Sequence, residues 1–120
     1  MAIAADFRVI DHVAGKLASG EAHTFKLDIP ANVIRGGGQP KSVMLVKYFL
    51  EGASALTWEL FLNGTRLLSS SGSGSHLLMT MEAFDSNLLL AGENQIEIKV
   101  THGLGTLRIG DTMVNFHVTV

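Results

Sequence analysis

Apolar and polar residues alternate with a period of two through much of this chain. In 23–29, Phe25, Leu27 and Ile29 alternate with polar residues, and Pro30 ends the segment because it has no amide donor. The same alternation appears in 95–101 and again in 114–120. This period is typical of β-strands that bury one face, so we expect three strands here.

Two central segments have a different pattern. Between its ends, Ser42 and Glu51, the segment 42–51 is apolar on both faces apart from Lys47, which fits a strand that is covered on both sides or meets a partner. The segment 56–62 places Trp58 with three leucines on one face, and Phe61 with Thr57 and Glu59 on the other. We therefore expect Trp58 to be buried.

The connections between these segments are rich in Gly and Ser. Asn63-Gly64 is the strongest hairpin signal, because both residues accept the positive φ of a type I′ turn. Further turns or loops are predicted at 14–20, 32–40, 52–55, 70–75, 102–105 and 110–111. About eight or nine strands without a long helix indicate an all-β sandwich or a small barrel.

The segment 85–101 predicts a corner between two parts of the fold. Asp85 or Ser86 is expected to cap one helical turn that carries three leucines, with Gly92 at its end. A strand with Ile96, Ile98 and Val100 on its inner face follows. In this interpretation Glu93 and Asn94 belong to the turn rather than to a ligand site.

Two motifs resemble a known family. The run Leu60-Phe61-Leu62-Asn63-Gly64-Thr65-Arg66-Leu67 and the run Leu89-Leu90-Ala91-Gly92-Glu93-Asn94-Gln95-Ile96-Glu97-Ile98 are similar to the hairpin and the corner of galactose-binding-like jelly rolls. These are sandwich domains attached to glycoside hydrolases and polysaccharide lyases. The resemblance covers residues 23–120. It implies an antiparallel β-sandwich of jelly-roll type, and carbohydrate as the ligand class.

Composition narrows the choice of partners. The chain has 120 residues, a net charge of −2 and no cysteine, so we expect one domain over 1–120, no nucleic-acid partner and no disulfide. Within it, 1–22 is expected to be an edge strand, at 7–13, or an arm. Charged residues make up only 17%, which favours an apolar surface that meets a partner, including a copy of itself.

The sequence shows no signal peptide and no apolar run long enough to span a membrane. A cytoplasmic location and release as part of an assembly both remain open.

Catalytic and metal motifs are absent from the sequence. The five histidines, His12, His23, His76, His102 and His117, lack the local spacing of a chelate, and Asp111 is the one candidate for calcium. Carboxylates such as Glu59 and Glu93 belong to no recognisable catalytic pair. We therefore expect no enzyme activity, no metal and no cofactor.

A binding function is expected to lie in loops at one end of the sandwich. The candidate ligand-binding residues are Asn63, Arg66, His76 and His102, whose side chains can hydrogen-bond hydroxyl groups. The main hypothesis is a non-catalytic, lectin-like carbohydrate-binding module. The alternative is a structural subunit of a homo-oligomeric particle or complex, and a homo-oligomer is expected.

Overall fold

The computed structural model describes residues 2–10 and 15–120. Its elements are β1 (Ile3–Ile10), β2 (Ala22–Ile29), β3 (Ser42–Leu62), β4 (Thr65–Phe84), the short 3-10 helix η1 (Ser86–Leu88) and β5 (Gly92–Thr119). The lateral order of strands is β1–β5–β3–β4, and β2 also pairs with β5. Every strand pairing is antiparallel.

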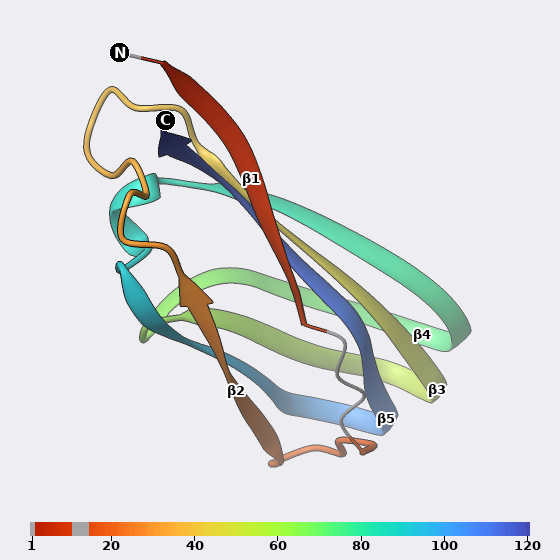
Figure 1. The fold of residues 1–120 in the computed structure, drawn as a ribbon. Coiled ribbons are helices and arrows are strands. Elements are labelled where there is room, and N and C mark those ends of the chain that lie inside the picture. Colours follow the sequence, from red (N-terminus) through yellow and green to blue (C-terminus); the bar gives the residue numbers. More distant parts are fainter. Residues whose placement is uncertain (1, 11–14) are drawn as a thin grey trace.

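The three long strands β3, β4 and β5 bend near their middles and run through both layers of a sandwich (Figure 1). Layer I contains β2 and the parts of β5, β3 and β4 nearest the Asn63-Gly64 hairpin. Layer II contains β1 and the other halves of the same three strands. Each layer therefore has four strand segments, and the fold is an antiparallel jelly roll, as predicted.

The predicted turns at 52–55 and 102–105 are bends within β3 and β5 rather than breaks between strands. The pairing of β3 with β5 shifts register between Glu51 and Thr57, which marks bulges at the bend. Gly103 and Gly105 have φ of 97° and 94°, and a Cβ at either position would overlap the backbone of β3. Close backbone contact at the bend thus requires glycine. The predicted turn at 110–111 also lies inside β5.

The Ser- and Gly-rich segment 70–75, predicted to be a loop, is part of β4. Its serines bond backbone amides of β3 at the bend, where regular pairing is lost. Ser75 Oγ accepts from Gly52 N, and Ser73 Oγ accepts from Ala55 N, both at 2.9 Å. The segment is therefore a strand that supplies hydrogen bonds to a bulged neighbour, which local composition does not reveal.

The core lies between the two layers. Trp58 is 1% exposed and its ring lies 4.8 Å from that of Tyr48, so both aromatic residues are buried, as predicted for Trp58. The inner faces of β3 and β5 supply most of the other fully buried side chains, including Leu60, Ile98 and Phe116. The alternating patterns of the sequence therefore assign the inner faces correctly in these strands.

The two motifs that resemble jelly-roll domains meet at one end of layer I. Asn63 and Gly64 form the two-residue hairpin of β3 and β4, with φ of 49° and 85°. Asp85 caps η1 by accepting from Asn87 N at 3.0 Å, and Gly92 has a φ of 90° at the start of β5. The hairpin and the cap at Asp85 are as predicted. The helical turn is shorter than predicted, because η1 ends at Leu88, and Gly92 begins β5 instead of ending the helix.

The N-terminal segment belongs to the sandwich. β1 begins at Ile3, earlier than the predicted strand at 7–13, and pairs with the end of β5 along its whole length. Leu17 is buried and forms an isolated bridge with Leu107. The rest of the predicted strand, including His12, lies outside the described residues. Within 2–10 and 15–120, no helix is long and apolar enough to cross a membrane.

Candidate functional site

The outer face of layer I is polar, with one aromatic side chain near its middle. Phe61 is half-buried in β3, where it pairs in register with Arg66 of β4 and Glu97 of β5. Two residues back along β3, Glu59 pairs in register with Ser69 and Lys99. We call these six residues of three adjacent strands the Phe61 surface.

Charged groups on the Phe61 surface hold one another in place. Arg66 Nη1 lies 2.9 Å from Glu59 Oε2, and the Arg66 side chain remains 59% exposed. Lys99 Nζ lies 5.2 Å from the centroid of the Phe61 ring, within cation–π range, and 3.9 Å from Glu97 Oε1. The arrangement therefore presents a ring edged by donors and acceptors whose positions are fixed by ion pairs.

This arrangement is chemically suited to a neutral polyhydroxylated ligand. An aromatic ring packs against the apolar C–H face of such a molecule. Arg66 and Lys99 are donors, while Glu59 and Glu97 are acceptors. The hydroxyl groups of a ligand can therefore accept hydrogen bonds from the first pair and donate them to the second. Hydrogen bonds that involve charged groups are stronger than those between neutral ones.

The structure brings only part of the predicted site to this face. Arg66 lies within the Phe61 surface, and His102 lies further along it, in register with Thr57. His76 is exposed on the far side of the bend, where it pairs with Leu50 in layer II. The four residues are thus not gathered at one end of the sandwich.

Asn63 is held by protein partners. Its Nδ2 donates to Leu88 O at 2.9 Å and to Asn94 Oδ1 at 2.8 Å, and its Oδ1 accepts from Gln95 N at 2.8 Å. Its side-chain amide therefore joins the hairpin to the corner. We do not include Asn63 in the Phe61 surface.

Phe61 was not among the residues selected from the sequence. The alternation in 56–62 already places Phe61 on the face opposite Trp58, together with Thr57 and Glu59. Trp58 and Tyr48, the single tryptophan and tyrosine, are both buried and so do not form an exposed aromatic platform. The pairing with Glu97 and Lys99 connects positions more than 35 residues apart. Only the register of β3 against β5 reveals that pairing.

A metal centre receives no support from the described residues. Within 2–10 and 15–120, no three His, Asp or Glu side chains are grouped in a way that could hold a metal ion. Asp111, the calcium candidate, is an exposed residue within β5 of layer II.

Comparisons with known proteins establish similarity of fold. No protein-family model and no curated protein matches the sequence. Among solved structures, dimeric latent PorU from Porphyromonas gingivalis is similar with a TM-score of 0.73 and 12% identity, over 98% of this chain and 13% of that one. BuGH86 in complex with neoagarooctaose has a TM-score of 0.62 and 20% identity, over 95% of this chain and 19% of that one.

A third similar structure matches over nearly its whole length. The CBM36-1 domain of a multidomain xylanase from the hindgut metagenome of Trinervitermes trinervoides has a TM-score of 0.57 and 9% identity, over 91% of this chain and 96% of that one. This chain thus spans less than a fifth of PorU and BuGH86, but corresponds in size to a carbohydrate-binding module. At these identities the likeness shows the jelly-roll fold.

Proposed function

We propose that this protein is a non-catalytic carbohydrate-binding module of the galactose-binding-like type, and that it binds its ligand on the Phe61 surface. The ligand is a neutral oligosaccharide that lies across β4, β3 and β5. The Phe61 ring stacks on one sugar, and Arg66, Glu59, Glu97 and Lys99 bond the hydroxyl groups around it. Binding is reversible and requires no cofactor.

One observation carries this proposal. Phe61 is the aromatic side chain on the outer face of layer I, and it is flanked on both neighbouring strands by charged residues. The half-buried ring, with Lys99 beside it, offers an aromatic face on which a sugar ring stacks, and the charged neighbours bond its hydroxyl groups. The similarity to a xylanase-attached module and to part of a protein crystallised with an agarose oligosaccharide supports the ligand class.

Oligosaccharide binding tests the proposal directly. Isothermal titration with xylan and agarose oligosaccharides, after a glycan array to select the ligand, should give a dissociation constant in the micromolar to millimolar range. Phe61→Ala should weaken it at least tenfold, because stacking on an aromatic ring is lost. Phe49→Ala is the matched control, since Phe49 is an exposed aromatic residue of the same strand in layer II.

Two results would count against this function. The first is an array with no bound glycan for a folded wild-type protein. The second is equal weakening by both phenylalanine variants, which would place the ligand elsewhere. The same samples, incubated with the selected oligosaccharide, should show no shorter products, because the proposal assigns no catalytic pair.

A second candidate function, that of an assembly subunit, is favoured by a separate observation. The outer face of layer II carries large apolar side chains on all four of its strands, although Met113 is flanked on β5 by the polar residues Asp111 and Asn115. A face of this kind is typical of a surface that is covered by a protein partner.

A further inference from the structure

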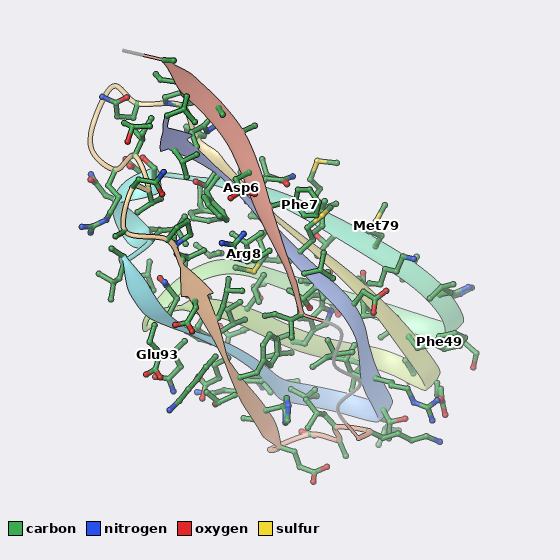
Figure 2. The ribbon with its side chains drawn as sticks, in the orientation of Figure 1. Asp6, Phe7, Arg8, Phe49, Met79 and Glu93 are labelled. Atoms are coloured by element: carbon green, nitrogen blue, oxygen red, sulfur yellow. The ribbon has the colours of Figure 1, made fainter. Side chains whose placement is uncertain are left out.

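The outer face of layer II carries large apolar side chains that remain open to solvent. Seven of them, each between 40% and 65% exposed, are Ile3, Phe7, Val9, Phe49, Leu77, Met79 and Met81. Figure 2 shows Phe7 on β1, Phe49 on β3 and Met79 on β4, all in the same layer. Together with half-buried Leu45 and Met113 they form a surface that we call the apolar face.

The register of the strands shows one unbroken apolar row across the apolar face, whereas the row that contains Phe7 includes the polar residue Asn115 on β5. Val9 pairs with Met113, Met113 with Leu45, and Leu45 with Met81, so one apolar row crosses β1, β5, β3 and β4. Four strands spaced by about 4.8 Å, each about eight residues long, span roughly 19 Å by 26 Å. The resulting area, about 490 Å², is roughly three fifths of the ~800 Å² that each partner contributes to a stable interface of standard size. It lies within the range of the largest apolar patch on a typical monomer, about 300 to 600 Å².

The apolar face has both a projection and a hollow. Phe7 is 56% exposed and projects from β1. Beside it, a hollow of about 220 Å³ is lined by Val9, Leu45, Lys47, Met79, Asp111 and Met113. An apolar cavity of about 150 Å³ accepts a benzene ring, so this hollow has room for a phenyl side chain. A surface with a projection beside a matching hollow is self-complementary under two-fold symmetry.

The hollow is lined by one positive and one negative side chain, a pair of charges that is compatible with contact between two identical faces. Lys47 and Asp111 are exposed, and neither makes an ion pair within the part of the chain that the structure describes. Opposite charges of equal number bring no net repulsion when a face meets its own copy.

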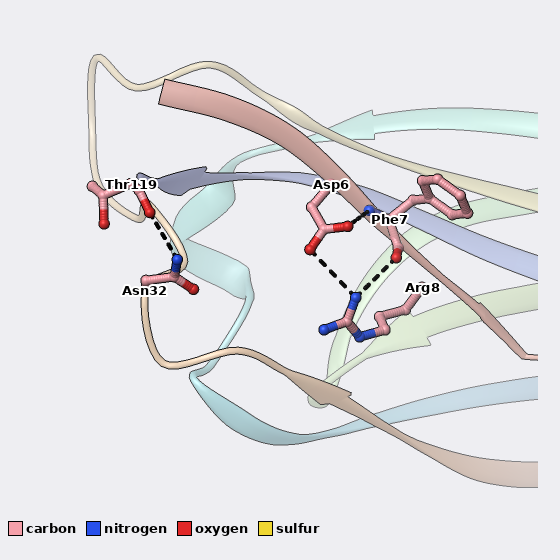
Figure 3. A network of polar contacts seen from close by, with 5 residues as sticks. All are labelled: Asp6, Phe7, Arg8, Asn32 and Thr119. Atoms are coloured by element: carbon pink, nitrogen blue, oxygen red, sulfur yellow. Dashed lines mark hydrogen bonds and ion pairs between the residues drawn. The ribbon is translucent and has the colours of Figure 1, made fainter. Parts of the chain in front are cut away.

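The free edge of β1 is blocked at Phe7, where local side chains bond the backbone. Phe7 N donates to Asp6 Oδ1 at 2.8 Å, and Phe7 O accepts from Arg8 Nη1 at 3.1 Å (Figure 3). Asp6 and Arg8 also lie 3.3 Å apart as an ion pair. Local side chains thus occupy the backbone N–H and C=O of Phe7, which makes the middle of this edge less available to a further strand than the face beside it.

We propose that the apolar face packs against the same face of a second copy of this chain, with Phe7 of each protomer in the hollow between Val9, Leu45, Met79 and Met113 of the other. The two protomers form a closed two-fold dimer, because one face serves both. This dimer is independent of carbohydrate binding, which uses the outer face of layer I. If the protein is an assembly subunit, the assembly that we propose is this dimer and not a larger particle.

Light scattering after size-exclusion chromatography tests the dimer. The wild-type protein should show twice the 12.8 kDa chain mass at micromolar concentration. Phe7→Glu and Met79→Glu should each raise the dimer dissociation constant at least roughly 30-fold, because a charge in the centre of a buried apolar contact is not compensated. Leu104→Glu is the matched control, since Leu104 is 71% exposed but lies at the bend, outside the apolar face.

Each result decides the question. A wild-type protein that stays monomeric up to several hundred micromolar overturns the proposal, and so does a dimer that persists in both glutamate variants. A dimer that dissociates equally in Leu104→Glu also overturns it. Circular dichroism serves as the control that each variant is folded. Glycan binding by monomeric Phe7→Glu would then show that the two functions are separate.

Discussion

The side chains of Asn63 and Asn94, which are 31 residues apart, are joined by a hydrogen bond from Nδ2 to Oδ1 of 2.8 Å. Asn63 belongs to the hairpin of β3 and β4, and Asn94 to the corner that starts β5. Asn94 also bonds the backbone of Leu90 and Gly92. The two motifs of the sequence are therefore parts of one hydrogen-bond network that closes an end of layer I.

Replacement of Asn94 by Ala should lower the free energy of unfolding by about 2 to 4 kcal/mol, because several buried polar groups lose their partner. Asn94 is 1% exposed, so water does not replace the lost bonds. Urea denaturation measures the change. Asn87→Ala, an exposed asparagine in η1, should change it by less than about 0.5 kcal/mol. Equal effects of the two variants would show that the network contributes little.

Replacement of Gly103 by Ala should prevent stable folding or cost more than about 4 kcal/mol. A Cβ there would overlap the backbone of Ala55 and Leu56, which cannot move without breaking the bend of β3. Gly20→Ala separates the cost of the positive φ from the cost of the overlap, because Gly20 has a φ of 89° but no atom close to an added Cβ. It should cost only about 1 to 2 kcal/mol. Thermal unfolding of both variants checks this, and a Gly103→Ala protein as stable as Gly20→Ala would contradict it.

The contribution of the Glu51 carboxylate to folding stability should vary with pH, and Lys16 should be the main cause. The Lys16 ammonium, 2.7 Å from Glu51 Oε2, lowers the pKa of this carboxyl by a hydrogen bond and by its charge, and Arg108 adds a smaller effect. Because the folded-state pKa lies below the unfolded one, this stabilisation is present above the ordinary carboxyl pKa. It is lost as the pH falls through the lowered pKa.

Substitution at Lys16 tests this assignment. In Lys16→Met the pKa of Glu51, followed by the NMR shift of its carboxyl carbon, should rise toward the ordinary value. Arg108→Met should raise it less, because Arg108 is the weaker influence. An unchanged Glu51 pKa in Lys16→Met would rule out this ion pair in solution.

The sequence predicted much of the fold because local patterns determine the inner faces. The alternation around Ile98 and the Asn63-Gly64 turn were both confirmed. It did not predict the long bent strands, because a glycine at a bend and a glycine in a loop have the same local signal. Gly103 is distinguished only by the β3 backbone against it, and that contact spans nearly fifty residues.

The candidate site was less predictable because it depends on register. Arg66 and Phe61 are close in sequence, but Glu97 and Lys99 reach them only through the pairing of β3 with β5. His76 was chosen as a loop residue, yet it lies in a strand on the other side of the bend. For the apolar pattern of 42–51 the sequence left two alternatives, a strand covered on both sides or one that meets a partner. The structure leaves its outward face, with Leu45 half-buried and Phe49 exposed, uncovered within the described part of the chain.

The central claim is that carbohydrate binds to the Phe61 surface, and NMR titration of the amide signals with the selected oligosaccharide tests it most directly. The account predicts fast-exchange shifts concentrated on 57–61, 66–71 and 95–101, which belong to β3, β4 and β5 of layer I. It also predicts that these shifts disappear in Phe61→Ala, with little change on the apolar face. Saturable shifts that centre on Phe7, Met79 or the bend instead, or no shifts at millimolar ligand, would contradict the account.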